Sequence, residues 1–555
     1  MPKARIYNIC AGLPFADVLA AGLWAQAGQD PLRLMRGIVL VPHRRAVRVI
    51  ADAFLRLGEG RAMLLPEIRA IGDVEDDEPF VTNDLAVDHA MVDDCPPAIP
   101  DLRRQLLLTR LVMRYLERAS DDRPGGRSAP GQAAGLAAEL ARLLDQMQTE
   151  GVGFECLEAL VPEVYAEHWR TTLEFLSVVT DSWSQILRDE GAVDLVERRN
   201  RMLDGLAKRW TCKSPSRPVT IAGSTGSVPA TAELMRVVAR ITNGAVVLPG
   251  LDTEVDEATW SLIESDTTHP QHALAILLRT MSVPRSCVMN WGGQRLTKRR
   301  ECRFRLLNEA MRPASATARW SKLERALFDP GCGEGPTDGM TLIECDDPQE
   351  EAGVIALLLR EALEKETGTA ALVTPDRALA RRVKSELRRW GVEIDDSGGQ
   401  PLGDTPAFTF WRLVGNMMTE GLAPVPLLAA LKHPLATGGL EAGVFRRNVR
   451  QLELLVLRGP RPAPGITGLL SALRQAGRVW KSESREDDVF GPNFDGLITW
   501  LERLAPALRD FERAIASDAV SFSELLLVHN RLVELLGAAP DDGLRVFDVW
   551  SGEAG

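Results

Sequence analysis

The sequence lacks the residues with which most nucleotide-hydrolysing proteins hold ATP. No Gly-Lys-Ser or Gly-Lys-Thr occurs in its 555 residues. A phosphate-binding loop requires both residue types, because the lysine neutralises phosphate and the hydroxyl holds Mg²⁺. The eight cysteines form no Cys-x-x-Cys pair, so zinc-ribbon and clustered iron–sulfur spacings are absent as well. The common ATPase loop and the common cysteine-based metal sites are therefore excluded.

The sequence also lacks membrane and secretion signals. It has no run of about 18 apolar residues, so we expect no membrane span. The apolar stretch near the N-terminus carries Asp17 and lacks a signal-peptide layout. Scattered single thiols suit a reducing compartment, and we expect a cytoplasmic protein. The net charge of −12 argues against nucleic-acid binding over the whole surface but is compatible with a local basic groove.

What is present is a repeated alternation of strand and helix. We expect a buried strand at residues 4–12 and a further strand at 37–41, and each is followed by a stretch with helical spacing. Further strands are expected at 62–73, 218–222, 245–249 and 285–290. Such alternation predicts an α/β fold with a parallel sheet covered on both faces.

Composition divides the chain into segments. We expect a first α/β lobe from residues 1–96 and 211–328, interrupted by a helical insertion over 97–210. An acidic stretch at 73–94 reads as a solvated loop. Residues 329–339, DPGCGEGPTDG, read as a linker.

A second α/β block is expected at 340–404, with strands at 340–345, 369–375 and 392–396 and helices at 348–365 and 377–390. Residues 405–555 read as a helical insertion and a truncated remainder of the second lobe. Aligning Pro42 with Pro375 brings together two segments that both read as strand, proline, arginine-rich helix and glycine, which favours duplicated lobes.

The segment 218–252 has the layout of a nucleotide-handling unit without its chemistry. Its first strand ends in Ala222-Gly223, where a motor protein would carry Mg²⁺-binding acids. The loop 222–227 alone could hold an anion at a helix N-terminus. We favour a glycine turn in which Ser227 caps a helix starting at Pro229. The loop after the first strand of the chain contains Gly12 and Pro14 but no lysine, and Pro14 has no N–H to offer a phosphate. We interpret Gly12, Ala222 and Gly223 as a degenerate nucleotide site.

Arginines gather where a phosphate backbone could bind. Arg44 and Arg45 start one predicted helix, and Arg377 and Arg381 lie on the matching helix of the second block. Residues 285–325 are also basic, and nearby tryptophans could stack on bases; these are Trp291, Trp320 and Trp390. The competing interpretation is a solvated helix face with the tryptophans in the core.

Two pairs of residues can be considered as metal ligands. Asp395 and Asp396 are adjacent carboxylates that could hold Mg²⁺ in a nuclease, but the sequence beside them offers no further nuclease residues. His269 and His272 are close together without a third ligand nearby. We therefore expect no metal site in this chain.

At these residues the chain resembles a known family. The segments VLVPHRRAVRVIADAF, MLLPEIRAIGDVEDDE, IAGSTGSVPATAEL, AVVLPGLD, AALVTPDRALARRVKSELRRWGVEIDDSGGQPL and LKHPLATGG resemble the N-terminal half of AddB, of the alphaproteobacterial type. The resemblance implies an inactivated superfamily-1 helicase scaffold with two RecA-like lobes and helical insertions. Residues 36–58 would face single-stranded DNA, and Arg377 would match an arginine that reaches the nucleotide in active motors.

The resemblance also implies partners. AddB acts with the AddA motor subunit, which uses ATP and Mg²⁺, in a helicase–nuclease that processes DNA double-strand breaks for homologous recombination. The scaffold would contact single-stranded and double-stranded DNA and scan for a regulatory sequence, and this chain itself would need no cofactor. Family members are about twice as long, so we expect a fragment that lacks the nuclease domain.

Two alternatives remain open. The lobes could brace the motor subunit and touch DNA little. The loop at residues 11–15 could also support an unusual ATPase.

Overall fold

The computed structural model describes residues 4–71, 95–120, 130–153, 156, 176, 182–293, 296–323, 335–365, 368–399, 401–483, 492–517 and 519–539. The chain divides into two compact units, Met1–Thr341 and Leu342–Gly555. The acidic loop predicted at 73–94 and residues 329–334 of the predicted linker lie outside the described residues.

The first unit contains a six-stranded sheet in the order β3-β2-β4-β5-β1-β6, with every recorded pair parallel. This confirms the predicted α/β class and parallel sheet. The strands are β1 Ile6–Ile9, β2 Ile38–Val41, β3 Glu67–Ala70, β4 Val219–Ala222, β5 Gly244–Pro249 and β6 Met289–Asn290.

Alternate residues of each strand face two different cores, as a strand period of two requires. Ile38 and Leu40 of β2 pack in one core with α9 Leu195–Cys212, α10 Pro229–Val238, α11 Glu257–Ser265 and α12 His272–Met281. Val39 and Val41 pack in the other core with α1 Phe15–Gln26, α2 Pro31–Leu34 and α3 Arg44–Leu57. Because all strands run in one direction, the loops after β1, β2, β4 and β5 share one edge of the sheet, where ligands of open α/β sheets bind.

A helical segment separates β3 from β4 along the chain. It contains α5 Asp101–Ser120 and α6 Pro130–Glu150, which pack on each other around their own core with Leu108, Ala137 and Leu140. The buried Asp194 accepts hydrogen bonds from Gln148 and Trp183 at 2.8 and 3.1 Å, and its carboxylate lies 2.8 Å from Arg104. These contacts tie the helical segment to the start of α9.

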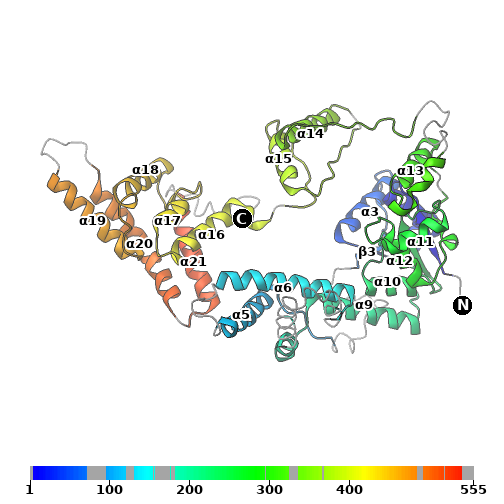
Figure 1. Ribbon diagram of the computed structural model, residues 1–555, viewed down its shortest axis with the longest axis horizontal. Coiled ribbons are helices and arrows are strands. Elements are labelled where there is room, and N and C mark those ends of the chain that lie inside the picture. Colours follow the sequence, from blue (N-terminus) through cyan, green and yellow to red (C-terminus); the bar gives the residue numbers. More distant parts are fainter. Residues whose placement is uncertain are drawn as a thin grey trace. The chain divides into compact units, whose positions relative to one another are not determined.

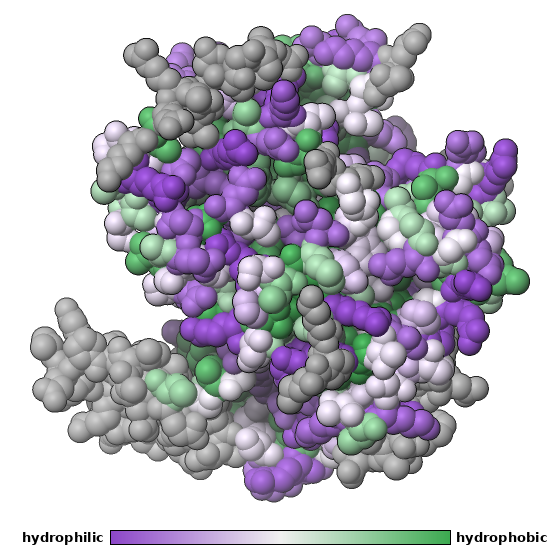
Figure 2. All heavy atoms as spheres, turned by 90° about the vertical axis from the view of Figure 1, so that its right-hand side faces the viewer, coloured by the Kyte–Doolittle hydropathy of each residue, from purple (hydrophilic) through white to green (hydrophobic). Residues whose placement is uncertain are grey.

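The remaining elements of the first unit follow β5 and β6. They are the 3-10 helices η2 Arg285–Cys287 and η3 Ala314–Lys322 and the helix α13 Lys298–Ala310. Figure 2 shows one face of the molecule, on which hydrophilic side chains lie among smaller hydrophobic areas.

The second unit begins with a helix pair. In Figure 1, α14 Pro348–Leu363 and α15 Arg377–Arg388 lie side by side, and they share a small core built on Ala352, Ala356 and Val383. Further along the chain an all-helical segment has a larger core that includes Phe410, Phe445 and Leu501. Its elements are η5 Leu402–Asp404, α16 Pro406–Thr419, α17 Pro424–Leu431, α18 Ala442–Leu452, the π-helix η6 Glu453–Leu457, α19 Gly465–Glu483, α20 Phe494–Ala516 and α21 Phe522–Leu536.

The strands predicted for the second block are wrong. Residues 340–345, 369–375 and 392–396 form no strand, although the helices between them form as predicted. A strand needs a neighbour to satisfy its backbone groups, and none of these segments pairs with another within the described residues. Leu342 and Val373 are 86% and 93% exposed, whereas Leu372 and Ile394 pack partly buried against the core of α14 and α15. Residues 36–58 and 369–391 therefore do not occupy equivalent places in two similar sheets, since only β2 lies in a sheet.

Within the described part of the chain, no helix combines the length and the apolar character that crossing a membrane requires.

Candidate functional site

The loop after β1 occupies the place where a phosphate loop would lie, and its local charge is unfavourable for phosphate. Gly12 has a φ of +87°, a conformation that suits glycine, and Pro14 is the N-cap residue of α1. The first turn of α1 already contains a carboxylate, Asp17, which accepts hydrogen bonds from Arg56 at 2.6 and 2.9 Å. Asp17 thus supplies the negative charge that a helix N-terminus favours.

Acidic groups also surround Cys10, immediately before this loop. Burial raises the pKa of the Cys10 thiol, and the nearby carboxylates of Glu254, Asp252 and Glu301 raise it further. The same negative potential would repel the phosphates of a nucleotide. These residues include no lysine or arginine that could pair with a phosphate.

Asp252, at the end of the strand–loop–helix–strand segment, has a structural role. Its carboxylate accepts hydrogen bonds from the N–H groups of Glu254 and Val255 at 2.8 and 3.1 Å. The side chain of Gln271 bridges the same turn, accepting from the Asp252 N–H and donating to the Gly250 carbonyl. Asp252 is thereby engaged in shaping the loop after β5.

The end of β4 carries no carboxylate. Ala222 is the last residue of the strand, and Gly223 follows with a φ of +78°. The Gly223 N–H donates to the Val247 carbonyl at 3.0 Å, and a Cβ at Gly223 would lie 3.4 Å from the ring of Phe15. This glycine therefore permits a close approach of the β4 loop to the start of α1 without offering a metal ligand.

The prediction for the helix that follows is partly wrong. The helix α10 does begin at Pro229, but Val228 is its N-cap residue and no side chain caps it. Ser227 therefore remains available for another partner.

The two arginine pairs predicted to bind DNA lie in different surroundings. Arg44 and Arg45 are exposed residues in the first turn of α3, where the side chain of His43 accepts a hydrogen bond from the Ala46 N–H at 3.1 Å. Cations at a helix N-terminus oppose the helix dipole. Among the described residues, Arg45 has no hydrogen-bond or ion-pair partner that would offset this repulsion.

On α15 the corresponding arginines are paired within the protein. Arg377 donates two hydrogen bonds to Asp396, at 3.0 and 2.7 Å, and a third to the Gly399 carbonyl at 2.8 Å. The bond from Arg377 is the main reason that the pKa of Asp396 falls to about 2. Arg381 lies 3.0 Å from Asp404. Asp396 thus serves as an arginine partner, and the described residues contain no acidic or histidine cluster able to hold a metal ion.

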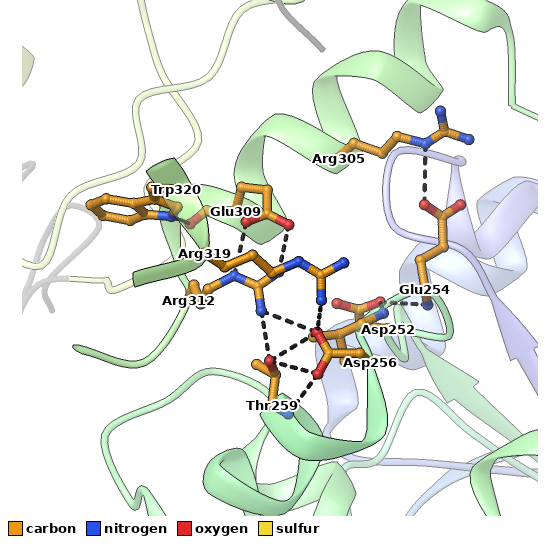
Figure 3. Close-up of polar contacts among 10 residues, drawn as sticks. Asp252, Glu254, Asp256, Thr259, Arg305, Glu309, Arg312, Arg319 and Trp320 are labelled. Atoms are coloured by element: carbon orange, nitrogen blue, oxygen red, sulfur yellow. Dashed lines mark hydrogen bonds and ion pairs between the residues drawn. The ribbon is translucent and has the colours of Figure 1, made fainter. Parts of the chain in front are cut away.

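Part of the basic segment 285–325 pairs with carboxylates of the loop after β5. Figure 3 shows the centre of this network, where Asp256 lies against Arg312 and Arg319 at 3.2 and 2.6 Å. The side chain of Arg312 is only 4% exposed and also pairs with Glu309. Hydrogen bonds from Thr259, with the two arginines, hold the pKa of Asp256 at about 2.

Other arginines of the segment are also engaged. Arg305 pairs with Glu254 at 3.3 Å (Figure 3), and Arg303 donates to the Pro336 carbonyl at 2.9 Å. Arg285 pairs with Glu257 at 2.6 Å and lies over the ring of Trp260. These arginines act mainly as internal ties.

The tryptophans considered for base stacking differ in exposure. Trp291 is 2% exposed and packs edge-on against Tyr7, so it is a core residue. Trp320 is 47% exposed, and its indole N–H donates to the Glu309 carbonyl. Trp390 is 37% exposed and lies beneath the guanidinium of Arg360.

Sequence reasoning missed one residue that organises the site. Asn8 is buried in the middle of β1, and its side chain bonds both backbone groups of Leu251. The available signal was a single amide within the apolar run Ile6–Ile9, since a buried polar side chain requires a partner.

Comparison with known proteins adds no family assignment. No protein-family model matches the chain, and no curated protein matches it.

Proposed function

We propose that this chain is the helicase-like, ATPase-deficient part of an AddB-type subunit, built on RecA-like lobes. It would act with an AddA-type motor subunit in a helicase–nuclease complex that processes DNA double-strand breaks for homologous recombination. The loss of nucleotide chemistry at the carboxyl edge of the sheet carries the first part of this proposal. The loops after β1 and β4 lie at one edge, as a RecA-like lobe requires, but they provide Pro14, Asp17 and Ala222 rather than a lysine and paired acids.

The experiment for this part is an ATP assay on the full chain. We expect steady-state phosphate release at background level and no heat of ATP binding with Mg²⁺ in calorimetry. Turnover above background that is lost on substituting residues 11–15 would identify an unusual ATPase and overturn the proposal.

For DNA contact, the start of α3 is a better candidate than α15. Arg45 is exposed and unpaired among the described residues, whereas Arg377 and Arg381 are each paired with a carboxylate. A phosphate at the start of α3 would relieve the conflict between arginine and helix dipole, so this turn gains from an anionic partner. We propose that Arg44 and Arg45 contact single-stranded DNA.

Fluorescence anisotropy with a single-stranded oligonucleotide tests this contact. Arg45→Glu should weaken binding and reduce its dependence on salt, because one phosphate contact fewer releases fewer counterions. Arg33→Glu is the matched control, since it makes the same charge change on α2, which precedes β2 at the opposite edge of the sheet. Equal affinity of both variants and the original chain would remove the assignment to α3.

The second candidate function is a structural brace for the motor subunit. The pairing of the basic segment 285–325 favours it, because arginines such as Arg312 and Arg319 are tied to Asp256 rather than presented to a ligand. In that case the chain would bind the motor subunit with unchanged affinity whether or not an oligonucleotide is present.

A further inference from the structure

A cavity of about 200 Å³ lies at the carboxyl ends of β2 and β4. Gly223 of the interpreted nucleotide site lines it, but no residue of 10–14 does, so the cavity is distinct from the loop after β1. Its lining comes from the ends of β2 and β3, from the loop after β4, and from the helices α9 and α10. The lining residues that matter here are Arg199, Ser224, Thr225, Ser227 and Thr231.

The polar groups of this cavity share one chemical character. Four hydroxyls and one guanidinium line it, and none of its lining residues is acidic. Thr231 is 8% exposed, and its side chain makes no hydrogen bond with the described residues. Its hydroxyl oxygen remains accessible from the cavity. Buried hydroxyls normally have a partner, so Thr231 has free hydrogen-bonding capacity for a water or a ligand atom in the cavity.

The start of α10 adds to the attraction for an anion. This ten-residue helix has Pro229 in its first turn and no side-chain cap. Its first N–H groups therefore retain the partial positive charge of a helix N-terminus. The side chain of Ser224, which is also buried, accepts from the Gly226 N–H at 3.2 Å and keeps its own hydroxyl hydrogen to donate.

Arg199 contributes a positive charge to the cavity, and its guanidinium forms no ion pair with a carboxylate among the described residues. Its Nε is buried and has no partner, and its one described hydrogen bond, to the hydroxyl of Thr149, is long at 3.5 Å. The carboxylate whose charge acts on it, Asp145, is already paired with Arg104 at 2.8 Å. Placing a guanidinium in such surroundings is unfavourable unless an anion joins it.

We propose that this cavity binds one oxyanion of the phosphate class, held by Arg199, the hydroxyls of Ser224, Ser227 and Thr231, and the start of α10. The oxyanion could be free phosphate or a phosphodiester of a nucleic-acid strand that passes the carboxyl edge. Only the second source rests on the function proposed above.

The test measures binding of inorganic phosphate to the full chain by calorimetry and by thermal shift, at constant ionic strength with chloride as the reference salt. Arg199→Gln and Thr231→Val should each weaken phosphate binding about tenfold or more, because each removes a hydrogen bond to a charged ligand. Thr231→Val keeps the side-chain shape and so preserves the fold. The controls are Arg201→Gln on the same helix, whose arginine pairs with Glu197, and Thr280→Val on α12; both should bind phosphate as the original chain does.

Absence of a phosphate effect beyond that of chloride, or equal phosphate binding by all five proteins, would overturn the proposal. A second arm identifies the source of the oxyanion. If a single-stranded oligonucleotide competes with phosphate and Arg199→Gln weakens both ligands, the site takes a phosphodiester. If the oligonucleotide binds all variants equally while phosphate distinguishes them, the site takes free phosphate, and failure of DNA binding alone leaves the phosphate result intact.

Discussion

The side-chain amide of Asn8 holds the backbone of Leu251 by two hydrogen bonds. Asn8 Nδ2 donates to the Leu251 carbonyl at 3.0 Å, and the Leu251 N–H donates to Asn8 Oδ1 at 2.8 Å. The two residues are 243 positions apart in the chain, on opposite sides of the helical segment that interrupts the sheet. This pair joins β1 to the loop after β5 and so fixes the carboxyl edge of the sheet at this point.

Replacing Asn8 with leucine should therefore destabilise the first unit. Two buried backbone groups of Leu251 would lose their partners, and we expect the free energy of unfolding to fall by about 2 to 4 kcal/mol. Urea unfolding followed by tryptophan fluorescence measures it. Asn290→Ala, at an exposed position in the neighbouring strand β6, is the control and should change little. An unchanged urea midpoint for Asn8→Leu would contradict the role assigned to the pair.

The network around Asp256 should make stability depend on acid pH. The pKa of Asp256 is about 2 in the folded protein, below its ordinary value of 3.8. The ionised carboxylate therefore stabilises the fold above pH 3.8, and this contribution is lost as pH falls towards 2. Asp256→Asn keeps an oxygen that can cap α11 but removes the charge opposite Arg312 and Arg319. We expect a loss of about 1 kcal/mol at neutral pH, because the carboxylate is partly exposed to solvent.

Unfolding curves of the original chain and Asp256→Asn at a series of pH values measure this effect, and their difference should shrink between about pH 4 and pH 2. Glu264→Gln on the same helix α11, a carboxylate without an ion pair among the described residues, is the control. A difference that stays constant with pH would show that charge is not the cause.

The ion pair between Arg377 and Asp396 should limit the affinity of the chain for DNA. If Arg377 can reach DNA, releasing it from its partner should increase affinity for a single-stranded oligonucleotide. Asp396→Asn should do this by up to about fivefold, the equilibrium equivalent of an exposed ion pair. Asp395→Asn removes the same charge one position earlier without freeing Arg377, and the anisotropy of the two variants can be compared directly. Identical affinities would assign Arg377 to the internal pair alone.

The packing of α1 on Trp291 should tolerate no added side chain at Gly22. A Cβ built at Gly22 would lie 2.1 Å from Trp291 Nε1, which is closer than real Cβ contacts come, so the indole must move. We expect Gly22→Ala to lower stability by about 1 to 3 kcal/mol and to change the tryptophan emission. Gly135→Ala, at an α6 position where a Cβ meets nothing within 4 Å, should instead raise stability slightly. If both substitutions stabilise the protein, the contact between α1 and Trp291 is looser than described.

The sequence was most informative where hydrophobic runs are paired in the sheet. The predicted strands around Ile38–Val41, Val219–Ala222 and Gly244–Pro249 are confirmed, because continuous apolar residues there are buried by helices on both faces. Similar hydrophobic runs at 340–345 and 369–375 led to a wrong prediction of strands. Burial of such a run depends on neighbouring strands and helices, which the local sequence pattern does not reveal. Leu342 and Val373 are hydrophobic and still exposed.

The sequence shows which charged residues the candidate site contains, but it does not show which of them pair with each other. Arg377 and Asp396 are both visible in the sequence, yet the bond between them depends on how the chain turns after α15. The loop 222–227 beside the cavity was visible in the sequence as a possible anion-binding turn, but the approach of Arg199 and Thr231 was not, since they come from helices separated by a strand. Pairings between distant side chains become visible only with the fold.

The unpaired backbone at the start of the second unit has a consequence for how the chain exchanges hydrogen with water. The amides of β5 are locked between β4 and β1 and should exchange only when the first unit opens cooperatively. The amides of residues 341–345 and 369–373 have no strand beside them in the described chain, and they should exchange at rates near those of an unfolded peptide. Among the described residues, these two stretches are also where we expect a protease to cut most readily.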